Sequence, residues 1–295
     1  MVELPLRLFA LEQAFKAHDK RQSELTRYFP VALIACVEGY FRMAIKDLID
    51  AGEPYLTNAE KPASSLKLDF SVLRAVHGKT ITVGELVAHG LALSRLEHIE
   101  SALTSLLGGS FLQSLRTTTD RWAHEVRGKP SAPILSNPDE VFAGIARTFE
   151  LRHIICHEIA SAYEIESDEV ARCLESSVTF LRAADEFISE TLHPGAPLTQ
   201  SDMNIAAGKS LSEKREWLSE AVATTRKRLD VQELIAFDES QAKWEAYCEA
   251  WVNFVAGERA NSGTIWPVIY FGEAEAVTTR RLDEVRSWRR LSDAA

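Results

Sequence analysis

Apolar residues recur at three- and four-residue spacing along most of the 295-residue chain. This spacing is the pattern of amphipathic α-helices. Two helices are predicted near the start, over residues 10–29 and 31–52, and the second should stop at Gly52 because glycine commonly follows the last helical residue. Further stretches with the same spacing are residues 139–164, 167–192, 212–229, 236–260 and 274–291. The pattern predicts an all-α protein.

Local signals indicate where some helices begin. Asn137 is the expected N-cap of one helix, with Pro138 and two acidic residues in its first turn. Ser167 is the expected N-cap of the next long helix. Residues 80–87 leave two alternatives open. They form either a short strand or the start of a helix at Thr82, and the helix is favoured by the glutamate three residues after that threonine.

A break in the helical pattern divides the chain. Residues 193–202 contain two prolines and a glycine and have no apolar periodicity, which is typical of a domain boundary. We expect a helical domain over residues 1–195, a linker over 196–204 and a smaller three-helix domain over 205–295. Within the latter, residues 261–273 are predicted to be a non-helical connector.

Composition narrows the classes of function. The net charge of −10 and the isoelectric point of about 5.4 argue against avid binding of bare duplex nucleic acid. They do not exclude an enzyme that acts on nucleic acid through a small local site.

We expect a cytoplasmic protein that does not associate with a membrane. Its longest strongly apolar run, residues 31–37, is far shorter than the roughly 20 residues that span a bilayer. Charged residues interrupt the first 15 positions, unlike a signal peptide. The four cysteines form no C-x-x-C pair, which favours free thiols.

The stretch LRHIICHEIA, residues 151–160, concentrates chemically active side chains. His153 and His157 lie about 40° apart on a helix, as paired metal ligands do, but no third ligand can be identified. We therefore predict no metal site and no cofactor. Cys156 is a candidate nucleophile, but the isoleucines around it indicate burial, and buried thiols are usually inert.

Arg152 and His157 allow a third interpretation. A guanidinium is a planar donor suited to phosphate oxygens, and histidine exchanges a proton near neutral pH. The two groups suffice to cleave RNA with its own 2′-hydroxyl as nucleophile, without a metal ion.

An Arg-x-x-x-x-His motif on a long helix of an acidic, all-helical domain resembles the HEPN family, of the RiboL-PSP and MAE-like type. The resemblance implies a helical bundle that dimerises so that two motifs line one cleft. It implies Arg152 as phosphate clamp, His157 as acid and base, and His153 as a substrate contact. Residues 37–49 resemble the first core helix of that family, with Glu38 and Arg42 as a supporting polar pair.

The HEPN resemblance implies a function and its partners. We expect a metal-independent endoribonuclease that acts on RNA as a homodimer formed by the N-terminal domain. Such enzymes serve as toxins or anti-phage defence effectors, so an antitoxin or a trigger protein is an expected partner, and the C-terminal domain would sense or regulate. The alternative is a non-catalytic interaction protein in which both domains bind a protein or a cell-wall-related partner.

The C-terminal domain carries a second pattern. The matching residues are Gln241, Trp244, Tyr247, Gly263, Thr264, Tyr270, Thr278 and Arg281. Over residues 205–290 the chain resembles the LprI-type lysozyme-inhibitor family, whose two cysteines are replaced here by Trp251 and Glu273. Disulfides are rare in the cytosol, so their absence agrees with a cytoplasmic location and argues against lysozyme inhibition.

The aromatic residues of this domain leave two alternatives. Trp244, Tyr247, Trp251 and Tyr270 form either the core of a small three-helix unit or, in part, a groove for a trigger or partner.

Overall fold

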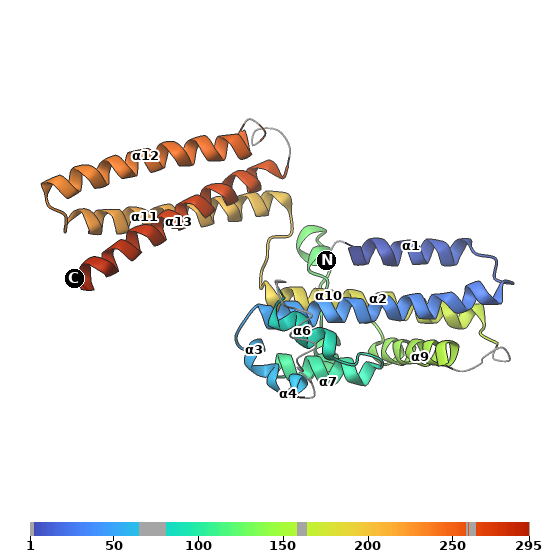
Figure 1. Cartoon of the computed structure of the whole chain (residues 1–295). Helices are drawn as coiled ribbons and strands as arrows, with labels where there is room; N and C mark the ends of the chain where they lie inside the picture. Colours follow the sequence, from blue (N-terminus) through green and yellow to red (C-terminus); the bar gives the residue numbers. More distant parts are fainter. Residues whose placement is uncertain (1–2, 65–80, 158–163, 258, 260–263, 295) are drawn as a thin grey trace. The chain divides into compact units, whose positions relative to one another are not determined.

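The computed structural model describes residues 3–64, 81–157, 164–257, 259 and 264–294. The chain divides into two compact units, residues 1–195 and 196–295. Throughout the described ranges the structure is helical and contains no strand, apart from an isolated bridge between Thr119 and Pro133 (Figure 1). The all-α prediction is confirmed.

The first unit contains long helices joined by short ones. In chain order its elements are α1 (Glu3–Ala17), α2 (Ser23–Asp50), α3 (Tyr55–Asn58), α4 (Glu60–Ala63), α6 (Val83–Gly90), α7 (Leu96–Leu107), α8 (Phe111–Leu115), the π-helical turn η1 (Trp122–Val126), α9 (Pro138–His157) and α10 (Ser167–Leu192). The second unit contains α11 (Gln200–Arg226), α12 (Val231–Val255) and α13 (Trp266–Ala294).

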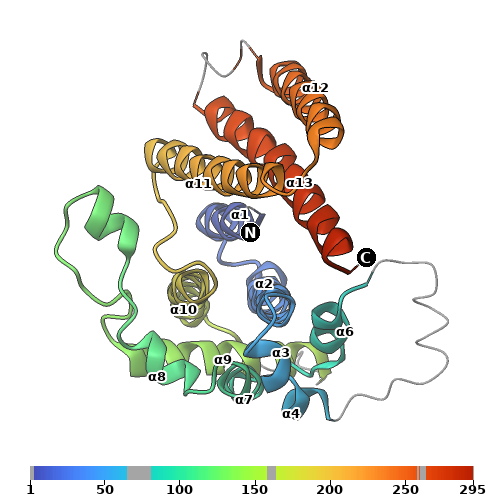
Figure 2. The ribbon, with the colours of Figure 1, turned by 90° about the vertical axis from the view of Figure 1, so that its left-hand side faces the viewer.

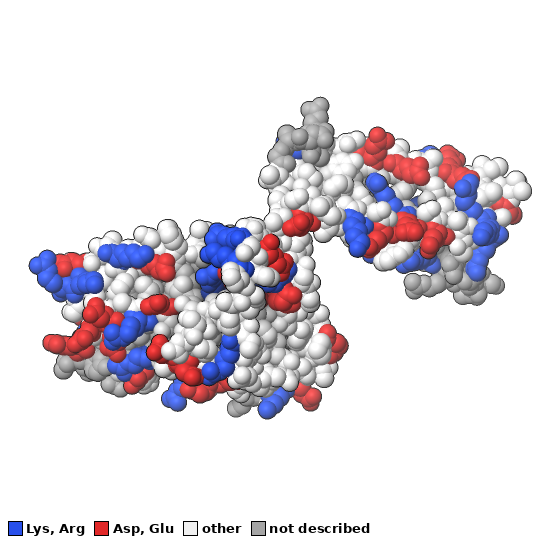
Figure 3. Space-filling view, turned by 180° about the vertical axis from the view of Figure 1, so that it is seen from behind, with Lys and Arg blue, Asp and Glu red and all other residues white. Residues whose placement is uncertain are grey.

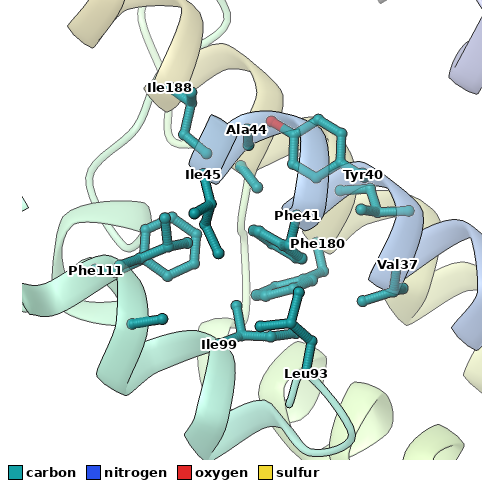
Figure 4. Close-up of a cluster of buried hydrophobic side chains, with 14 of the residues drawn as sticks. Val37, Tyr40, Phe41, Ala44, Ile45, Leu93, Ile99, Phe111, Phe180 and Ile188 are labelled. Atoms are coloured by element: carbon teal, nitrogen blue, oxygen red, sulfur yellow. The ribbon is translucent and has the colours of Figure 1, made fainter. Parts of the chain in front are cut away.

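Helix α2 forms the centre of the first unit. It packs against α1, α6, α9 and α10, and the last three lie around it in Figure 2. Phe41 of α2 is fully buried and meets the rings of Phe111 and Phe180 at centroid distances of 5.8 and 5.7 Å (Figure 4). Burial of aromatic and branched side chains at this seam supplies the main driving force for assembling the unit.

The first helix break lies elsewhere than predicted. The chain leaves helix over residues 18–22, which are mostly polar, whereas Pro30 lies inside α2. A proline removes one backbone hydrogen bond from a helix. Here the neighbouring Phe29 and Leu33 are buried, which offsets that loss. The other end is as predicted: α2 stops at Asp50, and Gly52 follows with a φ of +92°.

The length and composition of α2 also match those of a membrane-spanning helix. In its most apolar 18-residue window, 56% of the residues are buried inside the structure. Burial in the protein core accounts for that composition, because core helices have the same pattern.

Three helix starts were predicted from local signals. Thr82 is the N-cap of α6, its hydroxyl accepting from the Glu85 amide at 3.0 Å, so the helical alternative is confirmed and the strand is not. Helix α9 begins at Pro138, and its first backbone bond ends on the Asn137 carbonyl. The prediction of Ser167 as the N-cap of α10 was wrong, because Glu166 takes that position. The Ser167 hydroxyl is buried without a partner among the described atoms.

The second unit contains more helix than predicted. Helix α11 includes residues 200–204, which were expected to belong to the linker. Helix α13 already starts at Trp266, so most of the predicted connector is helical. Pro267 does not prevent this, because proline is tolerated in the first turn, where its missing N–H has no helical acceptor.

Helices α9 and α10 make a close contact at Gly144. A Cβ atom at that position would lie 2.1 Å from Ser176 Oγ and 2.5 Å from Ser176 Cβ. We expect Gly144→Ala to lower the free energy of unfolding by about 1–3 kcal/mol, as overpacked substitutions do. Urea unfolding followed by far-ultraviolet circular dichroism measures this change.

Gly39→Ala is the matched control. Gly39 also lies inside a helix, but nothing lies within 4 Å of a Cβ built there. It should leave stability unchanged or raise it by up to about 1 kcal/mol, since alanine favours helix over glycine. Equal effects of the two substitutions would contradict the close contact of α9 with α10.

Candidate functional site

The predicted Arg152, His153 and His157 lie together at the end of α9 and line one cavity of about 510 Å³. The facing wall is the start of α7 and the residues just before it, Ser94 to Glu97. The structure thus brings the three predicted residues together and adds a second wall from a helix some 50 positions earlier.

Buried apolar residues attach α9 to the rest of the unit. Ile145 and Phe149 belong to the main core of the first unit, and Leu151 is fully buried at the end of the helix. Arg152 is half-buried, whereas His153 and His157 are exposed. Because residues four positions apart share a helix face, the two imidazoles meet with ring centroids 5.0 Å apart.

Arg152 and His157 contact each other directly. Nη1 of Arg152 lies 3.5 Å from Nε2 of His157. A guanidinium can only donate hydrogen bonds, so Nε2 is the acceptor in this contact. A nitrogen that accepts in this way carries no hydrogen, and an unprotonated imidazole nitrogen is the form that can take up a proton.

The facing wall contributes two charged residues that were not predicted from the sequence, Arg95 and Glu97. Arg95 is exposed and has extended backbone geometry, with φ of −151° and ψ of 157°, as the residue that precedes α7. No motif marks it: a lone arginine before an amphipathic helix is ordinary in sequence, and only the packing of α7 beside α9 places it here.

The charges around the cavity are not balanced evenly. Glu150 also lines it, but its carboxylate pairs with Arg147 at 2.6 Å. Within the described part of the chain, Arg95 and Arg152 have no acidic partner, and Glu97 is the remaining carboxylate of the lining. The described residues contain no group of three or more His, Cys, Asp or Glu that could hold a metal ion.

The predicted supporting pair does not line the cavity. Glu38 is half-buried on α2. Arg42 donates to the carbonyls of Ala88, His89 and Leu91, at 2.7, 3.3 and 3.3 Å. These carbonyls lie at the C-terminal end of α6, where a helix has unsatisfied acceptors and negative partial charge. Arg42 therefore holds the end of α6 against α2.

The expected burial of Cys156 was wrong, because its side chain is exposed at the end of α9. The predicted continuation of this helix through residues 158–163 lies outside the described residues.

In the second unit, residues that carried the LprI resemblance link α12 to α13. Arg281 of α13 donates to Gln241 Oε1 at 2.6 Å and to Ser240 Oγ at 2.9 Å. Trp244 packs against the buried Leu282 and its neighbours. Gln241, Trp244 and Arg281 of the pattern thus make structural contacts between helices. Gly263 lies outside the described residues.

Trp251 and Glu273 stand where the LprI-type family has its two cysteines. Trp251 Nε1 donates to Glu273 Oε2 at 3.1 Å, so the two positions are neighbours in space. A hydrogen bond between α12 and α13 occurs where the resemblance implies a covalent link.

The aromatic residues of this unit are divided between a cavity lining and the exposed surface. Trp244 and Tyr270 line a cavity of about 540 Å³ whose walls are α11, α12 and α13. Tyr247 and Trp251 are 52% and 37% exposed and lie outside this lining. Of the 25 residues of α12, all of them described, only Val252 is buried, so this helix covers the cavity loosely.

Arg281 offers a test of the α12–α13 link. We expect Arg281→Ala to lower the free energy of unfolding by roughly 1–3 kcal/mol, because a charged hydrogen bond is lost and its partner is left half-buried. Tryptophan fluorescence during urea unfolding reports this unit, since five of the six tryptophans lie in it.

Lys209→Ala is the control for that test. Lys209 is 77% exposed and its pair with Glu213 spans 4.0 Å, so its loss should cost about 0–1 kcal/mol. If Arg281→Ala were no more destabilising than this control, Arg281 would not be the link between the two helices.

Comparison with known proteins bears on the second unit alone. Residues 194–285 match the family model of the lysozyme inhibitor LprI. No curated protein and no solved structure matches the chain significantly. The match confirms the resemblance of the C-terminal part, and the HEPN resemblance of residues 1–195 stays a prediction. The C-terminal unit is therefore similar to the LprI family.

Proposed function

We propose that the N-terminal unit is a metal-independent endoribonuclease in which His157 handles protons and Arg152 binds the phosphate. The observation that carries the proposal is the 3.5 Å approach of Arg152 to His157 in an open cavity with a second arginine. A permanent cation beside a proton-transfer group at a solvent-exposed cavity supplies both charge stabilisation and proton transfer for metal-independent phosphodiester cleavage.

The proposed reaction uses the 2′-hydroxyl of the RNA. Nε2 of His157 takes the 2′-hydroxyl proton, and the oxygen attacks the adjacent phosphorus. The bond from phosphorus to the 5′-oxygen breaks, and that oxygen receives the proton carried by His157, which returns to its unprotonated form. The products are a 2′,3′-cyclic phosphate and a 5′-hydroxyl. Arg152 stabilises the negative charge that develops on the phosphorane, and His153 contacts the substrate beside it.

A homodimer fits this proposal. His153 and His157 are exposed, so a second copy of the N-terminal unit has access to the same face. Two copies would bring two arginine–histidine pairs to one cleft and concentrate positive charge there. Such a local field can attract a polyanion even though the chain carries a net charge of −10. On the face that Figure 3 shows, acidic and basic residues are interspersed.

The biological setting follows as part of the same proposal. A ribonuclease of this kind would act in the cytoplasm as a toxin or a defence effector. The LprI-like unit would sense a trigger protein or bind an antitoxin.

Removal of His157 tests the catalytic role. We expect His157→Ala to lower RNA cleavage by at least about 100-fold, the typical contribution of a general acid or base. Cleavage by the wild type should persist in EDTA, because no step uses a metal. The readout is the decay of a labelled RNA on a denaturing gel.

His89→Ala is the control, since His89 is exposed on α6 and does not line the cavity. It should cleave at the wild-type rate. Cleavage that EDTA abolishes, or equal loss in the two variants, would contradict the proposed mechanism.

A second candidate function is supported by the match to the LprI family. In it the C-terminal unit binds lysozyme or another cell-wall-related partner, and the first unit is non-catalytic. The aromatic cavity between α11 and α12 provides a surface for such a partner.

Lysozyme binding can be measured directly. Under the second candidate, the full chain slows lysis of bacterial cell walls by lysozyme. Glu249→Lys, a charge reversal at the cavity, should weaken binding by at least about tenfold, since like charges brought together at an interface cost several kcal/mol. Glu239→Lys, outside the cavity, is the control. Lysis at an unchanged rate with the wild-type protein would exclude lysozyme as the partner.

A further inference from the structure

Arg95 faces the proposed catalytic residues from another part of the chain. It lines the same cavity as Arg152, His153 and His157, but it is the residue that immediately precedes α7. Its guanidinium has no acidic partner among the described residues. An exposed cation that is not engaged within the protein is available to a ligand.

The backbone at Arg95 is held on both sides. Leu93 and Leu96 are 2% and 6% exposed, so the chain enters and leaves this position through the core. Upstream, Arg42 binds the carbonyls of Ala88 and Leu91, which fixes the turn that leads to Arg95. Arg95 therefore projects from a rigid segment, and rigid placement lowers the entropy cost of binding.

The chemistry of the lining favours an anion. Two guanidiniums and two imidazoles face a space of about 510 Å³, and one of the two carboxylates beside them is engaged by Arg147. Guanidiniums on two sides of a cavity can each make a forked contact with phosphate oxygens. In a single-stranded nucleic acid, successive phosphates are free to reach both.

We infer that Arg95 binds a phosphate of single-stranded RNA next to the phosphate that Arg152 and His157 act on. This inference rests on the proposed ribonuclease function and adds a substrate-binding residue to it. Arg152 holds the scissile phosphate, and Arg95 sets the path of the strand across the cavity.

The test uses the full chain and a single-stranded 2′-O-methyl oligoribonucleotide, in which the nucleophile is blocked, with affinity measured by fluorescence anisotropy. We expect Arg95→Ala to weaken binding roughly tenfold, the effect of losing a charged hydrogen bond. The slope of log affinity against log salt concentration should fall by about 0.7, the value for one phosphate contact of a single strand. Arg95→Lys should keep the slope while losing part of the affinity.

Arg21→Ala is the matched control. Arg21 is 91% exposed and lies between α1 and α2, outside the cavity, so affinity and slope should match the wild type. If wild type binds the oligonucleotide and Arg95→Ala binds it with unchanged affinity and slope, the role of Arg95 is overturned while the ribonuclease proposal stands. If the wild type binds no oligonucleotide, Arg95 has no such role, and the separate cleavage assay of His157→Ala decides the ribonuclease proposal.

Discussion

Burial of α2 is the constraint on which the first unit depends. The helix has 28 residues, and its buried positions recur from Thr26 to Ile49, so one face is covered along nearly the whole length. Helices α6, α9 and α10 pack around it, each through its own apolar stripe. Because close-packed cores tolerate little displacement, the position of α2 determines where α9 ends and how its last turn is rotated. The cavity at that end is a consequence of packing far from it.

Arg42 connects this core to the cavity. It was expected to act beside the catalytic motif, and instead it satisfies carbonyls at the end of α6. That contact still serves the site, since the chain runs from α6 directly into the segment that carries Arg95. A polar residue on the central helix thus influences the cavity through backbone position, without contacting any group in it.

The second unit joins two of its helices by hydrogen bonds, one of them at the positions where the LprI resemblance implies cysteines. Arg281 with Gln241 and Trp251 with Glu273 hold α12 to α13 by hydrogen bonds. A disulfide would restrict the unfolded chain, whereas these bonds act in the folded state and contribute less. The weaker link agrees with the exposure of α12, on which most side chains face solvent. A loosely attached helix beside an aromatic cavity is suited to a unit that responds to a partner.

The sequence by itself determined the fold class, most helix positions and the start of α6 at Thr82. It also determined the grouping of Arg152, His153 and His157. All of these depend on the spacing of residues within a single helix. It also indicated the LprI-like residues of the C-terminal unit. It misplaced the first break at Pro30, where burial of Phe29 and Leu33 outweighed local preference. It also misplaced the cap at Ser167, whose hydroxyl is buried without a partner among the described atoms. Only the tertiary structure decided that Arg95 meets α9, that Arg42 binds the end of α6 and that Cys156 is exposed. These facts depend on which helices pack together, and contacts between residues distant in sequence leave no periodic signal in the chain.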